Sequence, residues 1–179
     1  FGTEANTRAP NEKMIKNSNL LKEAIEKYDM KTFQTLLDRG QIENIINLSG
    51  ETGLHIAADN GQTDIFQIII AIVKDKNPKD NCGYTPLHNA ASNGHAEIAK
   101  IILDMAEDKN PKSHFGYTPL HSAALHGHAE IVKMILDVVE DKNPKDNNGW
   151  TPLYEAAENG HTEIVKMLLD VVEDKNPVC

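Results

Sequence analysis

Apolar residues along this chain form short helical faces that recur every 33 residues. In the clearest copy, 83–103, the apolar positions of 87–91 fall on one narrow helix face and those of 98–102 fall on a second. The same pattern returns at 116–136 and 149–169, and a looser copy occupies 50–70. A fixed period of this length is typical of a solenoid, in which each unit buries its apolar face against its neighbours.

Polar and conformationally special residues mark the helix ends at the same places in each copy. Thr85 and Pro86 predict the start of the first helix, because a Thr hydroxyl can cap free amides and proline is tolerated at the first helical position. Gly94 predicts a tight turn and His95 the start of the second helix. The turn-rich string Asp-Lys-Asn-Pro-Lys then predicts a hairpin that leads to the next copy. Each unit therefore reads as helix, turn, helix and hairpin.

The N-terminal part of the chain departs from this pattern. Residues 1–16 are polar and without a sustained period, which predicts a flexible leader. From residue 17 the helical pattern begins, with Leu21 and Ala24 in the register of the apolar positions of later units. Lys22 and Tyr28 replace the His and Gly of those units. We expect 17–49 to be a cap-like first unit, because its outer face has no neighbour to cover it.

Several motifs at fixed phase identify a resemblance. The sequence Thr-Pro-Leu-His at 85–88 and 118–121, the Ala-Ala pair, Gly-His, and a following Glu-Ile-Val-Lys resemble the ankyrin repeat. The resemblance covers the chain from about residue 17 onward and implies an all-α ankyrin-repeat solenoid with short hairpin connections. Its expected units are the cap-like 17–49 and then 50–82, 83–115, 116–148 and 149–179.

The chain also departs from the family at the end of each second helix. Ankyrin repeats usually place a glycine there, whereas this sequence has Val73, Ala106, Val139 and Val172. Without a glycine to adopt the left-handed capping conformation, we expect each second helix to continue for a few more residues.

Composition and charge narrow the classes of function. The net charge of −9 and the lack of a Lys/Arg run argue against non-specific binding to nucleic acid or to anionic membranes. The longest apolar run, 68–73, is too short to span a bilayer, and 1–10 lacks the pattern of a signal peptide. Two distant cysteines, Cys82 and Cys179, form no disulfide framework. We therefore expect an intracellular, cytoplasmic protein, with a nuclear location left open.

The eight histidines invite a hypothesis of metal binding or catalysis. Six of them recur in frame, which indicates a structural role in bonding loop backbone between units; they are His55, His88, His121, His95, His128 and His161. His114 and His126 are off-frame and free to serve a partner. No third ligand completes a zinc site around the His-x-His pair at 126–128. With no phosphate loop or nucleophile motif present, we expect no metal, no cofactor and no enzymatic activity.

Exposed positions that vary between units predict a recognition surface. The family resemblance implies that hairpin tips and first helices line a concave groove that holds a protein or peptide partner. Tyr84, Tyr117 and Trp150 are expected to form an aromatic row there, although each ring could instead merely cover a neighbouring hairpin. The predicted partner-binding residues are Glu51, Asp59, Asn81, Cys82, Tyr84, Asn89, Ser92, Asn93, His114, Phe115, Tyr117, Ser122, Leu125, His126, Asn148, Trp150, Glu155, Glu158 and Asn159.

A second in-frame feature is an asparagine in each loop after the second helix. Asn77, Asn110, Asn143 and Asn176 each follow an Ile or Leu by eight residues. This is similar to the pattern that a cytosolic asparaginyl hydroxylase modifies in ankyrin domains. The alternative is that the side chain holds the loop through bonds to backbone.

These observations together predict a protein–protein interaction module that acts as a scaffold or adaptor. Two alternatives stay open: a regulatory or targeting segment of a larger enzyme, channel or effector, and a structural spacer within a longer array. The last unit keeps the apolar pattern of internal units, so we expect further repeats or self-association at that end.

Overall fold

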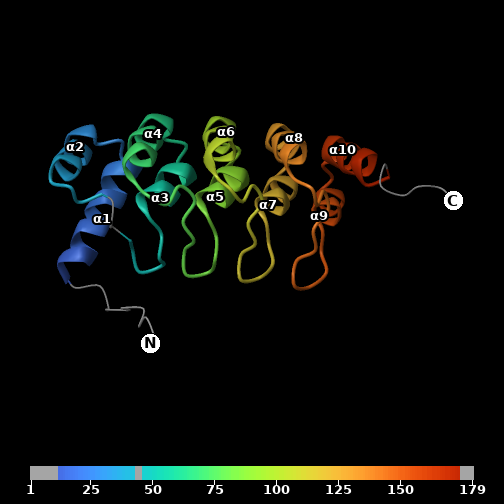
Figure 1. Ribbon diagram of the computed structural model, residues 1–179, viewed down its shortest axis with the longest axis horizontal. Helices are drawn as coiled ribbons and strands as arrows, with labels where there is room; N and C mark the ends of the chain where they lie inside the picture. The colour runs from blue at the N-terminus through green and yellow to red at the C-terminus, as the bar shows by residue number, and fades with distance from the viewer. Residues whose placement is uncertain (1–11, 43–45, 174–179) are drawn as a thin grey trace.

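The structure of the protein is a computed structural model that describes residues 12–42 and 46–173. That part of the chain consists of helices stacked in pairs (Figure 1). The helices are α1 (Glu12–Glu26), α2 (Met30–Asp38), α3 (Gly53–Asp59), α4 (Thr63–Ile72), α5 (Pro86–Asn93), α6 (Ala96–Met105), α7 (Pro119–His126), α8 (Ala129–Val138), α9 (Pro152–Glu158) and α10 (Thr162–Glu173). The predicted all-helical solenoid is confirmed.

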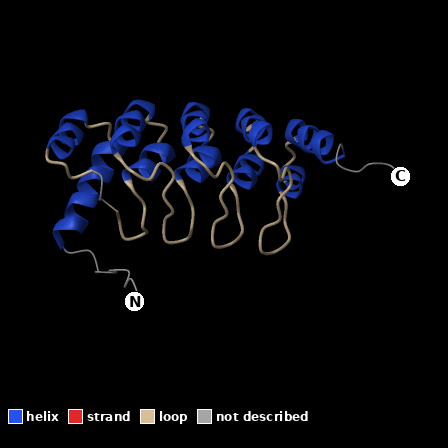
Figure 2. Ribbon diagram, in the orientation of Figure 1, coloured by secondary structure: helices blue, strands red, loops and turns tan. Residues whose placement is uncertain are grey.

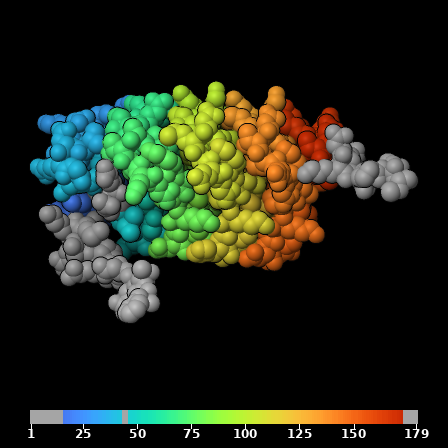
Figure 3. All heavy atoms as spheres, in the orientation of Figure 1, coloured from blue at the N-terminus to red at the C-terminus, as the bar shows by residue number. Residues whose placement is uncertain are grey.

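The helices form two layers, and hairpin loops project from one of them. First helices α1, α3, α5, α7 and α9 line one layer, and second helices α2, α4, α6, α8 and α10 line the other (Figure 2). Contacts run from each first helix to the next first helix, and along the second helices from α4 to α6, α8 and α10. Neighbouring units therefore touch continuously along the array (Figure 3).

The core lies between the two layers and repeats with the sequence. Leu87, Ala90 and Ala91 of α5 are fully buried, as are Ile98 and Ile102 of α6. The small alanines let first helices approach one another closely, while the isoleucines fill the space between layers. The apolar faces predicted from the sequence are thus the faces that the fold buries.

Threonine caps first helices as predicted, and in α7 a histidine, which was not predicted to cap a helix, completes the cap. Thr118 is the N-cap of α7, and its hydroxyl accepts a hydrogen bond from the His121 amide. In return His121 Nδ1 accepts from the Thr118 amide at 3.2 Å. Thr151 caps α9 through the Tyr154 amide at 3.2 Å. These reciprocal bonds satisfy amides that a helix N-terminus leaves free.

The expectation that second helices run on was wrong for three of them. Helices α4, α6 and α8 end directly before Val73, Ala106 and Val139, which adopt extended backbone with ψ of 151°, 142° and 150°. Extended backbone is open to any residue, so no glycine is needed to stop the helix. Only α10 continues past its equivalent position, Val172, to Glu173.

A lysine from the following loop supplies the cap that glycine usually provides. Lys109 Nζ donates to the carbonyl oxygen of Leu103 near the end of α6, and Lys142 does the same for Leu136 of α8. Lys76 reaches Ile70 of α4, and it also donates to the Val73 carbonyl at 2.7 Å. A positive charge at a helix C-terminus stabilises both the free carbonyls and the helix dipole.

The first unit begins earlier than the sequence pattern indicated. Helix α1 starts at Glu12, inside the range 1–16 that was expected to be a flexible leader. The segment 12–16 is rich in Glu, Lys and Met, whose helix propensity extends the helix without an apolar period. The rest of the expected leader lies outside the described residues.

Tyr28 replaces glycine at the turn of this first unit and carries a positive φ of 52°. Its hydroxyl bonds to Asp64 of the next unit. Leu21 and Ala24 of α1 are buried, as their register predicted. Among the helices that the structure describes, none combines the length and the apolar character that crossing a lipid bilayer requires.

Candidate protein-binding surface

Each hairpin tip is folded by one polar side chain that precedes the glycine. Asp80 Oδ1 accepts hydrogen bonds from the amides of Cys82 and Tyr84, both at 2.8 Å. Gly83 completes the turn with φ of +81°. Asp146 repeats this arrangement in the tip 146–150, and Ser113 Oγ takes the same place at 3.2 Å in the hairpin between them. The residues on either side of the glycine are therefore held in fixed positions at the tip.

Adjacent hairpin tips are joined by backbone hydrogen bonds. The amide of Asn81 donates to Ser49 at 3.0 Å, that of His114 to Cys82 at 2.9 Å, and that of Asn147 to Phe115 at 2.9 Å. Side-chain amides reinforce two of these links: Asn81 Nδ2 donates to the Leu48 carbonyl and Asn147 Nδ2 to that of His114. The tips thus form one continuous, ordered ladder.

This ladder and the first helices behind it define the hairpin–helix surface. It comprises the tips 47–51, 80–84, 113–117 and 146–150 together with α3, α5, α7 and α9. The tips lie at the projecting ends of the loops in Figure 1.

Aromatic side chains follow one another along this surface. The rings of Tyr84 and Phe115 lie 6.4 Å apart, and those of Trp150 and Tyr154 lie 5.2 Å apart. The ring of Tyr117 stacks on that of His121 in α7, with the ring centres 4.8 Å apart. Phe115 is 55% exposed, Trp150 45% and Tyr154 44%, whereas Tyr84 and Tyr117 are half-buried. The row therefore combines rings that cover neighbouring units with rings that face solvent.

Two of the predicted partner-binding residues are buried and do not lie on the accessible surface. Ser122 is 2% exposed and Glu155 is 4% exposed. Glu155 is covered because Tyr117 reaches across to the next first helix, where its hydroxyl donates to Glu155 Oε1 at 3.4 Å. Burial raises the pKa of Glu155. Burial, together with the neighbouring charge of Glu155, also raises the pKa of Tyr117.

The remaining predicted residues all reach the surface to some extent. Half-buried positions are Glu51, Tyr84, Asn89, Ser92, Tyr117 and Leu125. Exposed positions are Asp59, Asn81, Cys82, Asn93, His114, Phe115, His126, Asn148, Trp150, Glu158 and Asn159.

Several of these residues also bind one another between units. Asp59 Oδ1 accepts hydrogen bonds from the side-chain amides of Asn89 at 3.2 Å and Asn93 at 3.0 Å. The off-frame His126 donates from Nδ1 to the Ser122 carbonyl of its own helix. These contacts hold the polar side chains in place along the first helices.

The structural role of the in-frame histidines is confirmed. His88 Nε2 donates to the Tyr117 carbonyl at 3.1 Å, and His55 and His121 make the same bond to the hairpins that follow them. The second set points backward along the array: His95 Nε2 donates to the Asp59 carbonyl at 3.1 Å, and His128 and His161 repeat this contact. Each histidine thus joins two neighbouring units.

The loop asparagines bond to backbone, as the alternative to hydroxylation stated. Asn110 Oδ1 accepts from the Leu120 amide at 3.1 Å, and Asn143 Oδ1 from the Leu153 amide at 3.2 Å. Asn77 Oδ1 accepts from the Leu87 amide at the longer distance of 3.4 Å. Asn176 lies outside the described residues. Hydroxylation of these side chains stays a prediction.

The sequence analysis missed three features of the structure. The lysine caps and the tip-folding Asp80 and Asp146 recur in frame, so internal comparison contains the signal for both. Tyr154 was absent from the predicted set although its ring contacts Trp150. The sequence does mark Tyr154, because this tyrosine stands at the position where the preceding units carry His55, His88 and His121.

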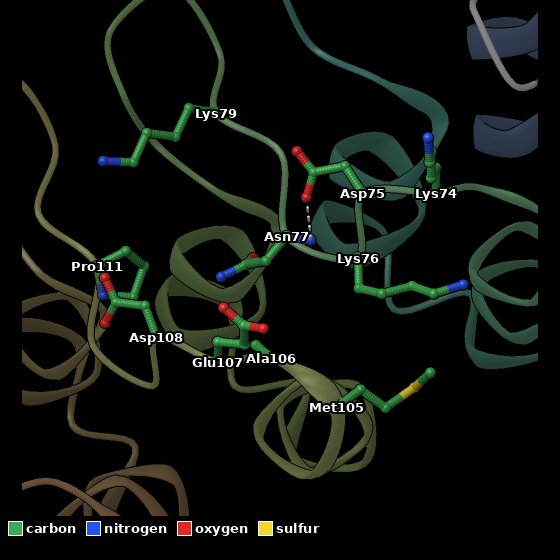
Figure 4. A pocket seen from close by; sticks show the side chains of 10 residues that line it. All are labelled: Lys74, Asp75, Lys76, Asn77, Lys79, Met105, Ala106, Glu107, Asp108 and Pro111. Carbon is green, nitrogen blue, oxygen red and sulfur yellow. Dashed lines mark hydrogen bonds between the residues drawn. The ribbon is translucent and has the colours of Figure 1, made fainter.

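Cavities elsewhere in the array do not resemble a ligand site. One of about 360 Å³ lies between the loops that follow α4 and α6, lined by Lys74, Asp75, Glu107 and Asp108 among others (Figure 4). A similar cavity of about 290 Å³ recurs one unit later. Both are products of the repeat geometry, and their walls alternate in charge. Within the described residues, no three His, Cys, Asp or Glu side chains are grouped so as to hold a metal ion.

Comparison with known protein families agrees with this geometry. A family model described as ankyrin repeats in three copies matches residues 20–113 and 105–178. No curated protein shows significant similarity to the chain. The matched residues cover most of the sequence and include the paired helices and the hairpin ladder. The chain belongs to the ankyrin-repeat family.

Proposed function

We propose that this chain is a protein–protein interaction module whose hairpin–helix surface binds a protein or peptide partner. Ankyrin repeats are in general protein-interaction modules, and the family is typically non-enzymatic. The observation that carries the proposal is the exposure of Phe115 and Trp150 on adjacent hairpin tips. Large aromatic side chains surrounded by polar groups are typical of the residues that contribute most to binding energy.

The order of the hairpin ladder supports this assignment. Bonds between tips, together with the Asp80 and Asp146 turns, fix the backbone that carries the aromatic rings. A surface that is already ordered loses little conformational entropy when a partner binds. The ladder therefore makes the tips a preorganised binding surface.

The test compares two pairs of exposed apolar residues. Phe115→Ser with Trp150→Ser removes the exposed rings of the hairpin–helix surface. Met105→Ser with Val138→Ser is the matched control, because these residues are 48% and 49% exposed at the ends of second helices. Ligands are first selected from a displayed random peptide library against the wild-type chain, and their affinity is then measured for each variant.

We expect the Phe115/Trp150 variant to lose at least about tenfold in affinity, since hot-spot truncations cost roughly 2 kcal/mol or more. The control variant should bind like the wild type. Equal loss in both variants, or loss only in the control, would contradict the proposal. Circular dichroism and thermal unfolding establish that each variant keeps its fold.

A further inference from the structure

Basic residues are absent from the whole hairpin–helix surface. Helices α3, α5, α7 and α9 contain no Lys or Arg, and neither do the tips 47–51, 80–84, 113–117 and 146–150. From residue 50 to 173, every lysine lies on a second helix or in a loop outside the tips. The same surface carries the carboxylates of Glu51, Asp59, Asp80, Asp146, Glu155 and Glu158. Lysine is therefore confined to the second helices and to the loops outside the tips, whereas carboxylates occur on both layers.

None of these carboxylates forms an ion pair with a lysine or arginine that the structure describes. Among the described residues, the ion pairs are Lys22–Glu26 and Lys27–Glu23, both within α1. Asp59 accepts from asparagine amides and Glu158 from the Tyr154 hydroxyl at 3.3 Å. Asp80 and Asp146 accept from backbone amides. Neutral donors leave the negative charges uncompensated, so the surface presents a negative potential to a partner.

Carboxylates and aromatic rings come together most closely between α7 and α9. Glu155 is almost fully buried beneath Tyr117, whose hydroxyl is its one hydrogen-bond donor among the described residues. Its second oxygen, Oε2, receives no bond there and retains contact with solvent. The charges of Glu158 and Glu155 both raise the pKa of Tyr154, whose ring contacts Trp150. The exposed carboxylate of Glu158 thus lies beside the exposed ring of Tyr154, which contacts that of Trp150.

This combination suits a cationic side chain. A guanidinium or ammonium group is attracted to the faces of Tyr and Trp rings. Arginine in addition presents a planar set of donors that matches a carboxylate. An acidic partner group would be repelled by Glu158 and Asp146, and a neutral group would leave the charge of Glu158 uncompensated.

We infer that the partner of the hairpin–helix surface is a basic peptide segment that places an arginine or lysine side chain against the exposed Glu158, Tyr154 and Trp150. This inference rests on the proposed function. It adds the chemical class of the partner and the point at which its charge is recognised.

The experiment uses charge-neutral substitutions that keep side-chain shape. One variant combines Asp59→Asn, Glu155→Gln and Glu158→Gln on first helices. The matched control combines Glu97→Gln, Glu130→Gln and Glu163→Gln, which make the same change in net charge at exposed positions of second helices. Because Glu155 is buried, the exposed pair Asp59→Asn with Glu158→Gln is measured as well, and unfolding of each variant is followed by circular dichroism.

The probes are three labelled peptides with identical apolar residues, whose charged positions carry arginine, glutamine or glutamate. Fluorescence anisotropy at physiological ionic strength should show binding of the arginine peptide, weakened about tenfold by the first-helix variant and at most about twofold by the control. Equal weakening in both variants means that only net charge attracts the peptide, and it overturns the inference. Preference for the glutamine or glutamate peptide also overturns it.

Ligands selected from the random library separate the two proposals. Selected ligands that depend on Phe115 and Trp150 and are enriched in arginine or lysine support both. Ligands that depend on these rings but lack basic residues overturn the inference and leave the proposed function standing. Absence of any ligand that depends on these rings overturns both.

Discussion

His88 joins two units of the array through its two ring nitrogens. Nδ1 accepts from the amide of Thr85 at 3.0 Å at the start of α5, and Nε2 donates to the carbonyl of Tyr117 in the next hairpin at 3.1 Å. One side chain therefore starts a helix and fixes the position of the following hairpin tip, 113–117. The stability of the array and the geometry of its hairpin–helix surface depend on the same residue.

We predict that His88→Ala destabilises the protein by about 3 kcal/mol, because it leaves the buried Thr85 amide without a partner, removes one of the two donors to the Tyr117 carbonyl and opens a small cavity. Urea unfolding followed by circular dichroism measures this loss. His114→Ala is the matched control, since His114 is exposed at a hairpin tip. Its effect should stay within about 0.5 kcal/mol. Similar losses in both variants would show that the inter-unit bond contributes little.

Stability should fall as the solution is acidified below pH 6.5. Burial lowers the pKa of His88 from 6.5 to about 3, and burial also lowers the pKa of His55 and of His121. Between the folded and the unfolded pKa of each histidine, the unfolded chain binds more protons than the folded chain. The contribution of each neutral histidine is therefore complete above pH 6.5 and is lost progressively as the pH falls toward the folded pKa.

For His88 alone this loss amounts to about 2 kcal/mol at pH 5, at about 1.4 kcal/mol per pH unit. Urea unfolding at pH 7 and pH 5 measures the difference. His88→Gln, which does not titrate, should show a smaller difference between the two pH values. An unchanged pH dependence in that variant would contradict the assignment.

Lys109→Met should destabilise the protein by about 1 kcal/mol, because the Leu103 carbonyl at the end of α6 loses its charged donor. Methionine keeps most of the apolar stem, so the change isolates the ammonium group. Lys133→Met, on an exposed face of α8, should have almost no effect in thermal unfolding. If the two variants are equally stable, the lysine is not a helix cap.

Gly127 and Gly160 offer a comparison between two equivalent turns. Both have positive φ, at 80° and 75°. A Cβ at Gly127 would lie 2.6 Å from His161 Cε1, whereas at Gly160 it would meet nothing within 4 Å. Gly160→Ala should cost about 1 kcal/mol from backbone strain alone. Gly127→Ala should cost about 3 kcal/mol, since His161 must also move. Equal losses of stability in the two variants would mean that the turn conformation alone sets the cost, without a contribution from His161.

Much of the fold was predictable because identical residues recur at identical places. Thr85, Pro86 and Gly94 act through local backbone geometry, which a single sequence displays directly. The ends of the second helices were not predictable in the same way. The cap of α6 comes from Lys109, six residues beyond Leu103, and only the folded loop brings the two together. The start of α1 was missed because helix propensity, rather than apolar spacing, extends it.

For the hairpin–helix surface, the sequence predicted which positions vary between units but not how far each one is buried. Variation between units located Phe115 and Trp150 correctly on exposed tips, since the repeat leaves those positions unconstrained. It also selected Ser122 and Glu155, which vary between units although both are buried. Burial of Glu155 depends on how far Tyr117 reaches from the previous unit, and this is a tertiary property that spacing does not encode.

The most direct test of the central claim is hydrogen–deuterium exchange of the chain with and without a ligand selected from the peptide library. The account predicts that protection on binding concentrates in the tips 80–84, 113–117 and 146–150 and in α5, α7 and α9. Helices α4, α6 and α8 should exchange as they do in the free protein. Protection confined to those second helices, with the tips unchanged, would contradict the claim that the hairpin–helix surface is the binding site.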